Sequence, residues 1–64
     1  MNNFSKPLKS VLSEAGWRYL RPGKGDHEIW HEPSTGRKVV VDNSMKSRHT
    51  ANAVLKQAGL PKAF

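Results

Sequence analysis

Apolar residues near the N-terminus recur three and four positions apart, which is typical of an amphipathic helix. The residues that form this stripe are Leu8, Val11, Leu12 and Ala15. We therefore predict a helix from about Pro7 to Ala15. Ser5 or Lys6 would cap its start, Pro7 suits its first turn, and Gly16 follows the last periodic residue, where a helix commonly ends.

Three short segments after this helix are rich in the β-branched and aromatic residues that favour strands. They are Trp17–Leu20, His27–His31 and Arg37–Val41. The glycines and proline of Arg21–Asp26 predict a loop between the first two strands. Glu32–Gly36, with Pro33 early and a glycine last, predicts a hairpin turn between the second and third.

The C-terminal third again has a helical period, with apolar residues at Ala51, Val54, Leu55 and Ala58. We predict a second helix from His49 or Thr50 to Ala58, ended by Gly59, with Leu60 packing back beside that end. The preceding segment Asp42–Arg48 is expected to be an exposed polar loop. The tail Lys62-Ala63-Phe64 is expected to be loose.

These elements predict an α+β fold of order α-β-β-β-α, with a three-stranded antiparallel sheet and two helices on one of its faces. This order resembles the double-stranded-RNA-binding-domain architecture. A chain of 64 residues forms one domain, which buries one thin core and has no room for an enclosed substrate cavity. Any active site must lie on the surface or in a shallow groove.

The charge of the chain changes this picture, because 11 lysines and arginines against five acids give a formal net charge of +6. Such an excess on a small surface indicates a polyanionic partner. The distribution is uneven. The segment from residue 43 to residue 64 contains no acid and four cations, namely Lys46, Arg48, Lys56 and Lys62. A basic surface without a specific ligand remains the alternative interpretation.

The chain has no cysteine, which excludes disulfides, thiolate metal sites and thiol nucleophiles. The lack of disulfides favours a reducing compartment. No apolar run approaches the roughly 18 residues of a membrane span, and the first residues lack the apolar stretch of a signal peptide. We therefore expect a cytoplasmic protein without a membrane partner.

Most catalytic motifs are missing from the sequence. Gly23-Lys24-Gly25 is too short for a phosphate-binding P-loop and precedes a predicted strand. His27 and His31 are too far apart on a strand to share a zinc ion, so we expect neither a metal nor a cofactor. No serine lies in the turn motif of a hydrolase triad. A catalytic pair of carboxylates is not expected either. Asp26 and Glu28 flank His27, but Glu28 points to the opposite face of the strand, and neither acid has a second acid beside it.

His27 remains as the candidate reactive group, because an imidazole can take up and give back a proton near neutral pH. RNA carries its own nucleophile, the 2′-hydroxyl, so a ribonuclease needs little beyond a positioned base and a cationic clamp. Arg21, Lys24 and Arg37 are candidates for that clamp. The alternative is that His27 is a half-exposed strand residue without a functional role.

The two tryptophans could stack on RNA bases. For Trp17, which follows the first helix directly, core packing is the preferred interpretation. Trp30 lies on the strand face opposite to His27. If it is exposed, it is a candidate binding surface.

Three ordered segments and the closing helix resemble the HicA toxin family. They are Gly16-Trp17, Gly25-Asp26-His27-Glu28-Ile29-Trp30-His31, Thr35-Gly36-Arg37-Lys38-Val39-Val40-Val41, and Thr50 with Leu55-Lys56-Gln57-Ala58-Gly59-Leu60. The resemblance extends from about Leu8 to Leu60, and the single domain 1–64 is therefore interpreted as a HicA-like toxin.

The resemblance implies an mRNA interferase toxin of a type II toxin–antitoxin system, with a double-stranded-RNA-binding-like fold and metal-independent cleavage of RNA. It also implies a HicB-like antitoxin that blocks the catalytic histidine. His27 occupies the position of that histidine and Gly25 that of the family's glycine. Together with Arg21, Lys24, Arg37 and Lys38, Gly25 forms the set that we expect to bind RNA.

The sequence departs from the family pattern in two places. Asp26 precedes His27 where the family usually has a small uncharged residue, and this acid could orient the imidazole or repel phosphate. Asp42-Asn43-Ser44-Met45 stands in place of a stretch that often contains proline and histidine.

Three hypotheses follow. The first is an endoribonuclease with His27 as general acid and base. The second is a non-catalytic double-stranded-RNA-binding-like module, which would retard RNA on a gel without shortening it. The third is an interaction protein whose cationic face binds an acidic partner and does not retain RNA at low salt.

Overall fold

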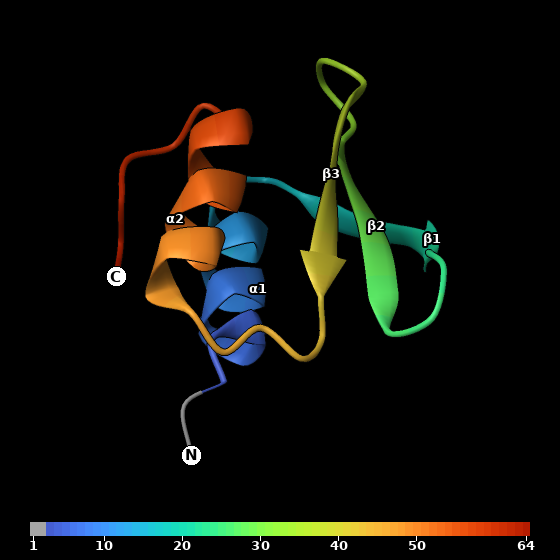
Figure 1. Cartoon of the computed structure of the whole chain (residues 1–64). Coiled ribbons are helices and arrows are strands. Elements are labelled where there is room, and N and C mark those ends of the chain that lie inside the picture. Colours follow the sequence, from blue (N-terminus) through green and yellow to red (C-terminus); the bar gives the residue numbers. More distant parts are fainter. Residues whose placement is uncertain (1–2) are drawn as a thin grey trace.

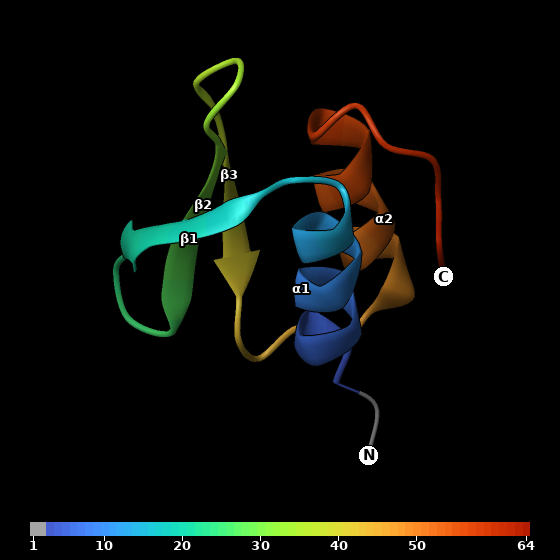
Figure 2. The same cartoon turned by 180° about the vertical axis from the view of Figure 1, so that it is seen from behind.

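The computed structural model describes residues 3–64 and confirms the predicted order of elements. Helix α1 (Ser5–Glu14) is followed by strands β1 (Arg18–Pro22), β2 (His27–Glu32) and β3 (Arg37–Asp42), and then by helix α2 (Arg48–Gln57). The strands form one antiparallel sheet in the order β1-β2-β3. Figures 1 and 2 show both helices on the same side of this sheet, which leaves its other face uncovered. Within residues 3–64, neither helix has the length and apolar character needed to cross a membrane.

The core lies between the helices and the sheet, and each element contributes the apolar residues of one face. The largest fully buried side chains are Trp17, Leu8, Leu12, Leu55 and Val41. Burying each of them contributes on the order of 1.5–3 kcal/mol. Trp17 is therefore a core residue, as predicted.

Trp30 is also buried, with 8% of its surface exposed. It packs edge-to-face against Tyr19 at a centroid distance of 6.3 Å. Its cross-strand partner on β3 is the buried Val39, and both residues belong to the core cluster on the helix side of the sheet. The condition under which Trp30 was a candidate binding surface, exposure of its side chain, is therefore not met.

The start of α1 differs from the prediction. The helix begins at Ser5 with Phe4 at the N-cap position, so neither Ser5 nor Lys6 caps it. Instead the side chain of Asn3 accepts a hydrogen bond from the Ser5 backbone N–H at 2.9 Å. The start was misplaced because the capping oxygen lies two residues before the helix, outside the apolar stripe. Gly16 follows the end of α1, as predicted.

The segment between β3 and α2 is only in part the exposed loop that its polarity predicted, since Ser44, Lys46 and Ser47 are exposed. Asp42 belongs to β3, and Met45 is 2% exposed within the core. The Met45 carbonyl accepts a hydrogen bond from the Phe4 backbone N–H at 2.8 Å. One buried methionine therefore anchors the segment and ties it to the start of α1.

The C-terminal tail is also held in place, contrary to expectation. Asn52 of α2 donates to the Phe64 carbonyl at 2.9 Å, and its side-chain oxygen accepts from the Ala63 and Phe64 backbone N–H groups. The Phe64 ring contacts the Phe4 ring edge-on at 5.6 Å. The tail therefore runs back along α2, as Figure 1 shows.

Candidate active site on the open face of the sheet

The glycine loop before β2 holds His27 at the edge of the sheet. Gly23 donates its N–H to the His27 carbonyl at 2.8 Å, and His27 donates its own N–H to the Lys24 carbonyl at 3.2 Å. A Cβ atom on Gly23 would lie 3.0 Å from the His27 Cβ and 3.2 Å from its carbonyl oxygen. A side chain at Gly23 would therefore push the loop away from the histidine. Gly25 has φ +64° at the tip, a conformation that favours glycine.

The same loop orients the imidazole ring. The Nδ1 atom of His27 lies 2.7 Å from the Lys24 carbonyl oxygen. Because a carbonyl can only accept, we assign the proton of the neutral ring to Nδ1. Nε2 is then the free acceptor. The side chain is 45% exposed, so this nitrogen is accessible to a large ligand.

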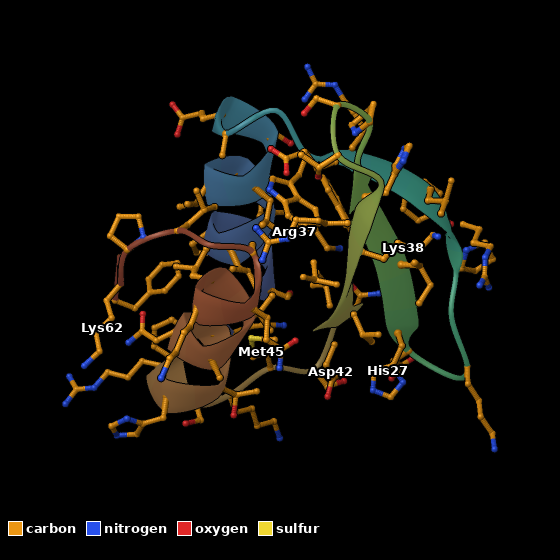
Figure 3. All side chains as sticks on the ribbon, turned by 90° about the horizontal axis from the view of Figure 1, so that it is seen from above. His27, Arg37, Lys38, Asp42, Met45 and Lys62 are labelled. Carbon is orange, nitrogen blue, oxygen red and sulfur yellow. The ribbon has the colours of Figure 1, made fainter. Side chains whose placement is uncertain are left out.

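Asp42 is the acid that faces this imidazole. Its Oδ2 lies 3.9 Å from His27 Nε2, and its Oδ1 accepts from the Ser44 backbone N–H at 2.8 Å. His27 and Asp42 are cross-strand partners at the open end of the β2–β3 hairpin. Figure 3 shows both side chains together at this end.

Asp42 was missed by the sequence analysis, although a signal for it was present. The pairing of Glu32 with Arg37 across the turn fixes the register of the hairpin, and five residues further along each strand it pairs His27 with Asp42. Counting outward from the predicted turn would have found this contact.

Asp26 has a different role from the one its position suggested. Its carboxylate accepts a hydrogen bond from the Ser44 hydroxyl at 3.3 Å, and its carbonyl accepts from the Asn43 N–H at 3.0 Å. Asp26 therefore joins the loop before β2 to the segment after β3, and the acid that approaches the imidazole is Asp42.

The cations predicted to bind RNA divide between the two faces of the sheet. Lys38 pairs with His31 and Arg21 pairs with Ile29, which places both on the open face with His27. Lys24 lies in the loop before His27. Arg37 lies on the helix side, where its guanidinium donates to the Gln57 carbonyl at 3.0 Å. Figure 3 shows Arg37 between the two layers and Lys38 beyond the sheet.

A polar cluster on the helix side supports the end of the sheet that carries His27. The Glu28 carboxylate accepts from Trp30 Nε1 at 3.0 Å and from Asn43 Nδ2 at 3.2 Å, and it pairs with Lys9 of α1 at 3.1 Å. The Trp30 hydrogen bond, opposed by partial desolvation and assisted by Lys9 and Asn43, lowers the pKa of Glu28. Because Glu28 follows His27 and Asn43 follows Asp42, this cluster joins the strand ends that carry His27 and Asp42 to α1.

The open face also carries apolar surface beside the histidine. Val40 lies two residues before Asp42 on β3, on the same face of the sheet, and is 50% exposed. Its cross-strand partner is the half-buried Ile29. Within residues 3–64 there is no cluster of three or more histidine and acidic side chains arranged to hold a metal ion. The face therefore offers the exposed imidazole of His27 beside one carboxylate, the half-buried imidazole of His31, several cations and a small apolar area.

One of three comparisons with known proteins gave a match. A search of curated proteins and a search of solved structures gave no match. The family model of the HicA toxin of bacterial toxin–antitoxin systems matches residues 5–60, which include all five elements and His27. The chain therefore belongs to the HicA toxin family.

Proposed function

We propose that this toxin is an mRNA interferase, an endoribonuclease that cleaves transcripts with His27 as its general acid and base. The observation that carries the proposal is the exposed imidazole, whose Nδ1 is bound to the Lys24 carbonyl and whose Nε2 faces the Asp42 carboxylate at 3.9 Å. Membership of a toxin family supports RNA as the substrate, since HicA toxins are known to cleave RNA. The +6 charge supports a polyanionic substrate in general.

In the proposed reaction, His27 Nε2 takes the proton of a ribose 2′-hydroxyl. The 2′-oxygen then attacks the adjacent phosphorus, and the bond from phosphorus to the 5′-oxygen of the next nucleotide breaks. The imidazolium returns its proton, through a water molecule, to the leaving 5′-oxygen. The products are a 2′,3′-cyclic phosphate and a 5′-hydroxyl. Atoms and charges balance without a metal ion, so the activity is expected to persist in a chelator.

The neighbouring charges assist two stages of this reaction. The Asp42 carboxylate, 3.9 Å from Nε2, stabilises the imidazolium that forms after proton transfer. Arg21, Lys24 and Lys38 hold the RNA backbone and offset the negative charge that develops on the phosphate. Arg37 is not part of this clamp, because its guanidinium binds the end of α2.

We also propose that a HicB-like antitoxin silences the toxin by covering the open face of the sheet. The exposed Val40 beside His27 offers an apolar contact for it. A protein that acts on transcripts and is paired with an antitoxin would work in the cytoplasm.

The experiment that tests this function follows the fate of one phosphodiester bond. The purified toxin is incubated with end-labelled RNA in the presence of a chelator, and the products are separated. We expect shortened products with cyclic phosphate ends, and no cleavage at a position where the 2′-hydroxyl is replaced by hydrogen. Retardation of intact RNA on a gel, without cleavage, would instead support a non-catalytic RNA-binding module.

A further inference from the structure

A second basic surface lies away from His27, between α2 and the C-terminal tail. It is an open groove of about 270 Å³ lined by His49, Asn52, Ala53, Lys56, Leu60 and Lys62. The proposed reaction does not use any of these residues. In Figure 3, Lys62 lies on the outer side of the helix layer, whereas His27 lies on the sheet side.

The groove has a defined construction. His49, Asn52, Ala53 and Lys56 recur three and four positions apart, so they share one face of α2. The tail forms the opposite wall, because the Asn52 side chain makes three hydrogen bonds to Ala63 and Phe64. Asn52 therefore holds the backbone that follows Lys62 beside α2.

The charged side chains that line the groove are all of one sign. Two ammonium groups and one imidazole line it, and no acid occurs between residues 43 and 64. Lys56 and Lys62 make no ion pair within the described part of the chain, where the ion pairs are Lys9–Glu28 and His27–Asp42. Two unpaired lysines facing one groove repel each other unless an anion lies between them. The groove thus favours a phosphate-bearing ligand.

A hollow along α1 provides a contrast. It is lined by Lys6, Lys9, Ser10, Ser13 and Glu14. Lys9 is already bound to Glu28, and Glu14 adds negative charge to the rim. Like the α2 groove, this hollow is lined by two lysines, but it also contains an acid. A lysine of this hollow therefore serves as a control for the loss of one positive charge.

From these observations we infer that the α2 groove is a second RNA-backbone site, which holds a stretch of the same transcript that the His27 face cleaves. This inference rests on the proposed RNA substrate. The Cα framework measures only 33 × 27 × 16 Å, so one RNA strand can pass from the open sheet face around the molecule to α2. Two linked contacts make long RNA bind more tightly than either face alone allows. The groove would therefore select long transcripts over short fragments.

The test measures binding, not cleavage, in the full-length His27→Ala protein. The probes are a short labelled oligouridine that fits one face and a several-fold longer one. Lys56→Gln is expected to weaken binding of the long probe and to make its salt dependence shallower by about 0.7 in the slope of log K against log salt, the value for one lost single-strand phosphate contact. Lys6→Gln, which removes the same charge from an exposed site on α1, is expected to leave that slope unchanged.

Asn52→Ala provides a second variant that removes no charge. Releasing the tail from α2 should weaken binding of the long probe while binding of the short probe stays close to that of the parent. Equal behaviour of Lys56→Gln and Lys6→Gln would overturn the inference and leave the proposed cleavage intact. The inference would also be overturned if Lys56→Gln weakened binding of an acidic antitoxin and left RNA binding unchanged. Conversely, a protein that cleaves no RNA but shows the Lys56 effect would contradict only the proposed function.

Discussion

On the helix side of the sheet, β3 buries Val39 and Val41, whereas on the open side it exposes Val40 between Lys38 and Asp42. Successive residues of one strand thus serve two purposes. One set packs against the helices, and the other presents charge and apolar surface on the face where we propose that RNA binds. The strand period of two assigns each residue to one purpose, so chemically similar neighbours should respond differently to the same substitution.

The largest expected difference is between two valines of β3. Val41→Ala removes two fully buried methyl groups and leaves a cavity, so it should lower the free energy of unfolding by about 2 kcal/mol. That loss corresponds to roughly 8–16 °C in melting temperature for a domain of this size. Val40→Ala, on the open face, should change stability by about 0.5 kcal/mol or less. Thermal unfolding followed by circular dichroism distinguishes the two, and equal losses would refute the division of the faces.

The adjacent cations Arg37 and Lys38 sharpen the comparison further. Arg37→Ala removes the hydrogen bond to the Gln57 carbonyl at the end of α2, and should lower stability by about 0.5–1 kcal/mol with little change in RNA affinity. Lys38→Ala should do the reverse, keeping the melting temperature and making the salt dependence of RNA binding shallower by about 0.7. If Arg37→Ala weakened RNA binding as much as Lys38→Ala, RNA would have to contact the helix side as well.

Asp42 tests whether the open face is organised around His27. Asp42→Asn keeps the shape of the side chain and removes the charge that faces Nε2 at 3.9 Å. Because both groups are partly exposed to solvent, we expect only a two- to fivefold slower cleavage, about the effect of a surface ion pair. Asp26→Asn is the matched control and should cleave at the wild-type rate. A larger loss in the control would make Asp26, not Asp42, the partner of the imidazole.

The smallest expected effect concerns the polar cluster on the helix side. The pKa of Glu28 lies below its ordinary value of 4.5 in the folded protein. Its stabilising contribution is therefore complete above that value and is lost as the pH falls through the lower, folded-state pKa. Stability of the wild type should decline in this acidic range more steeply than that of Glu28→Gln. Chemical denaturation at several pH values measures it, and parallel curves would exclude this contribution.

The sequence predicted the order and type of all five elements, because apolar spacing and turn residues are local signals. It also pointed to His27, through the glycine loop and the family resemblance. It did not predict the contacts that join distant segments. Asp42 faces His27 through the hairpin register, and the segment with the buried Met45 is tied to the start of α1 by the hydrogen bond from Phe4.

The separation of Arg37 from the RNA-binding set depends in a similar way on tertiary structure. Its sequence neighbourhood is the same as that of Lys38, and the period of two predicts opposite faces but not which face the helices cover. The ordered tail likewise depends on Asn52, an amide whose partners lie 11 and 12 residues away. Such long-range hydrogen bonds leave no periodic signal in the chain.

The central claim is tested most directly by the single-turnover rate of RNA cleavage in wild type and His27→Ala. The side chain is exposed, so the variant should keep the wild-type melting temperature. Loss of general acid and base catalysis should slow cleavage by about 100- to 10 000-fold. A folded His27→Ala protein that cleaves RNA at the wild-type rate would contradict the account.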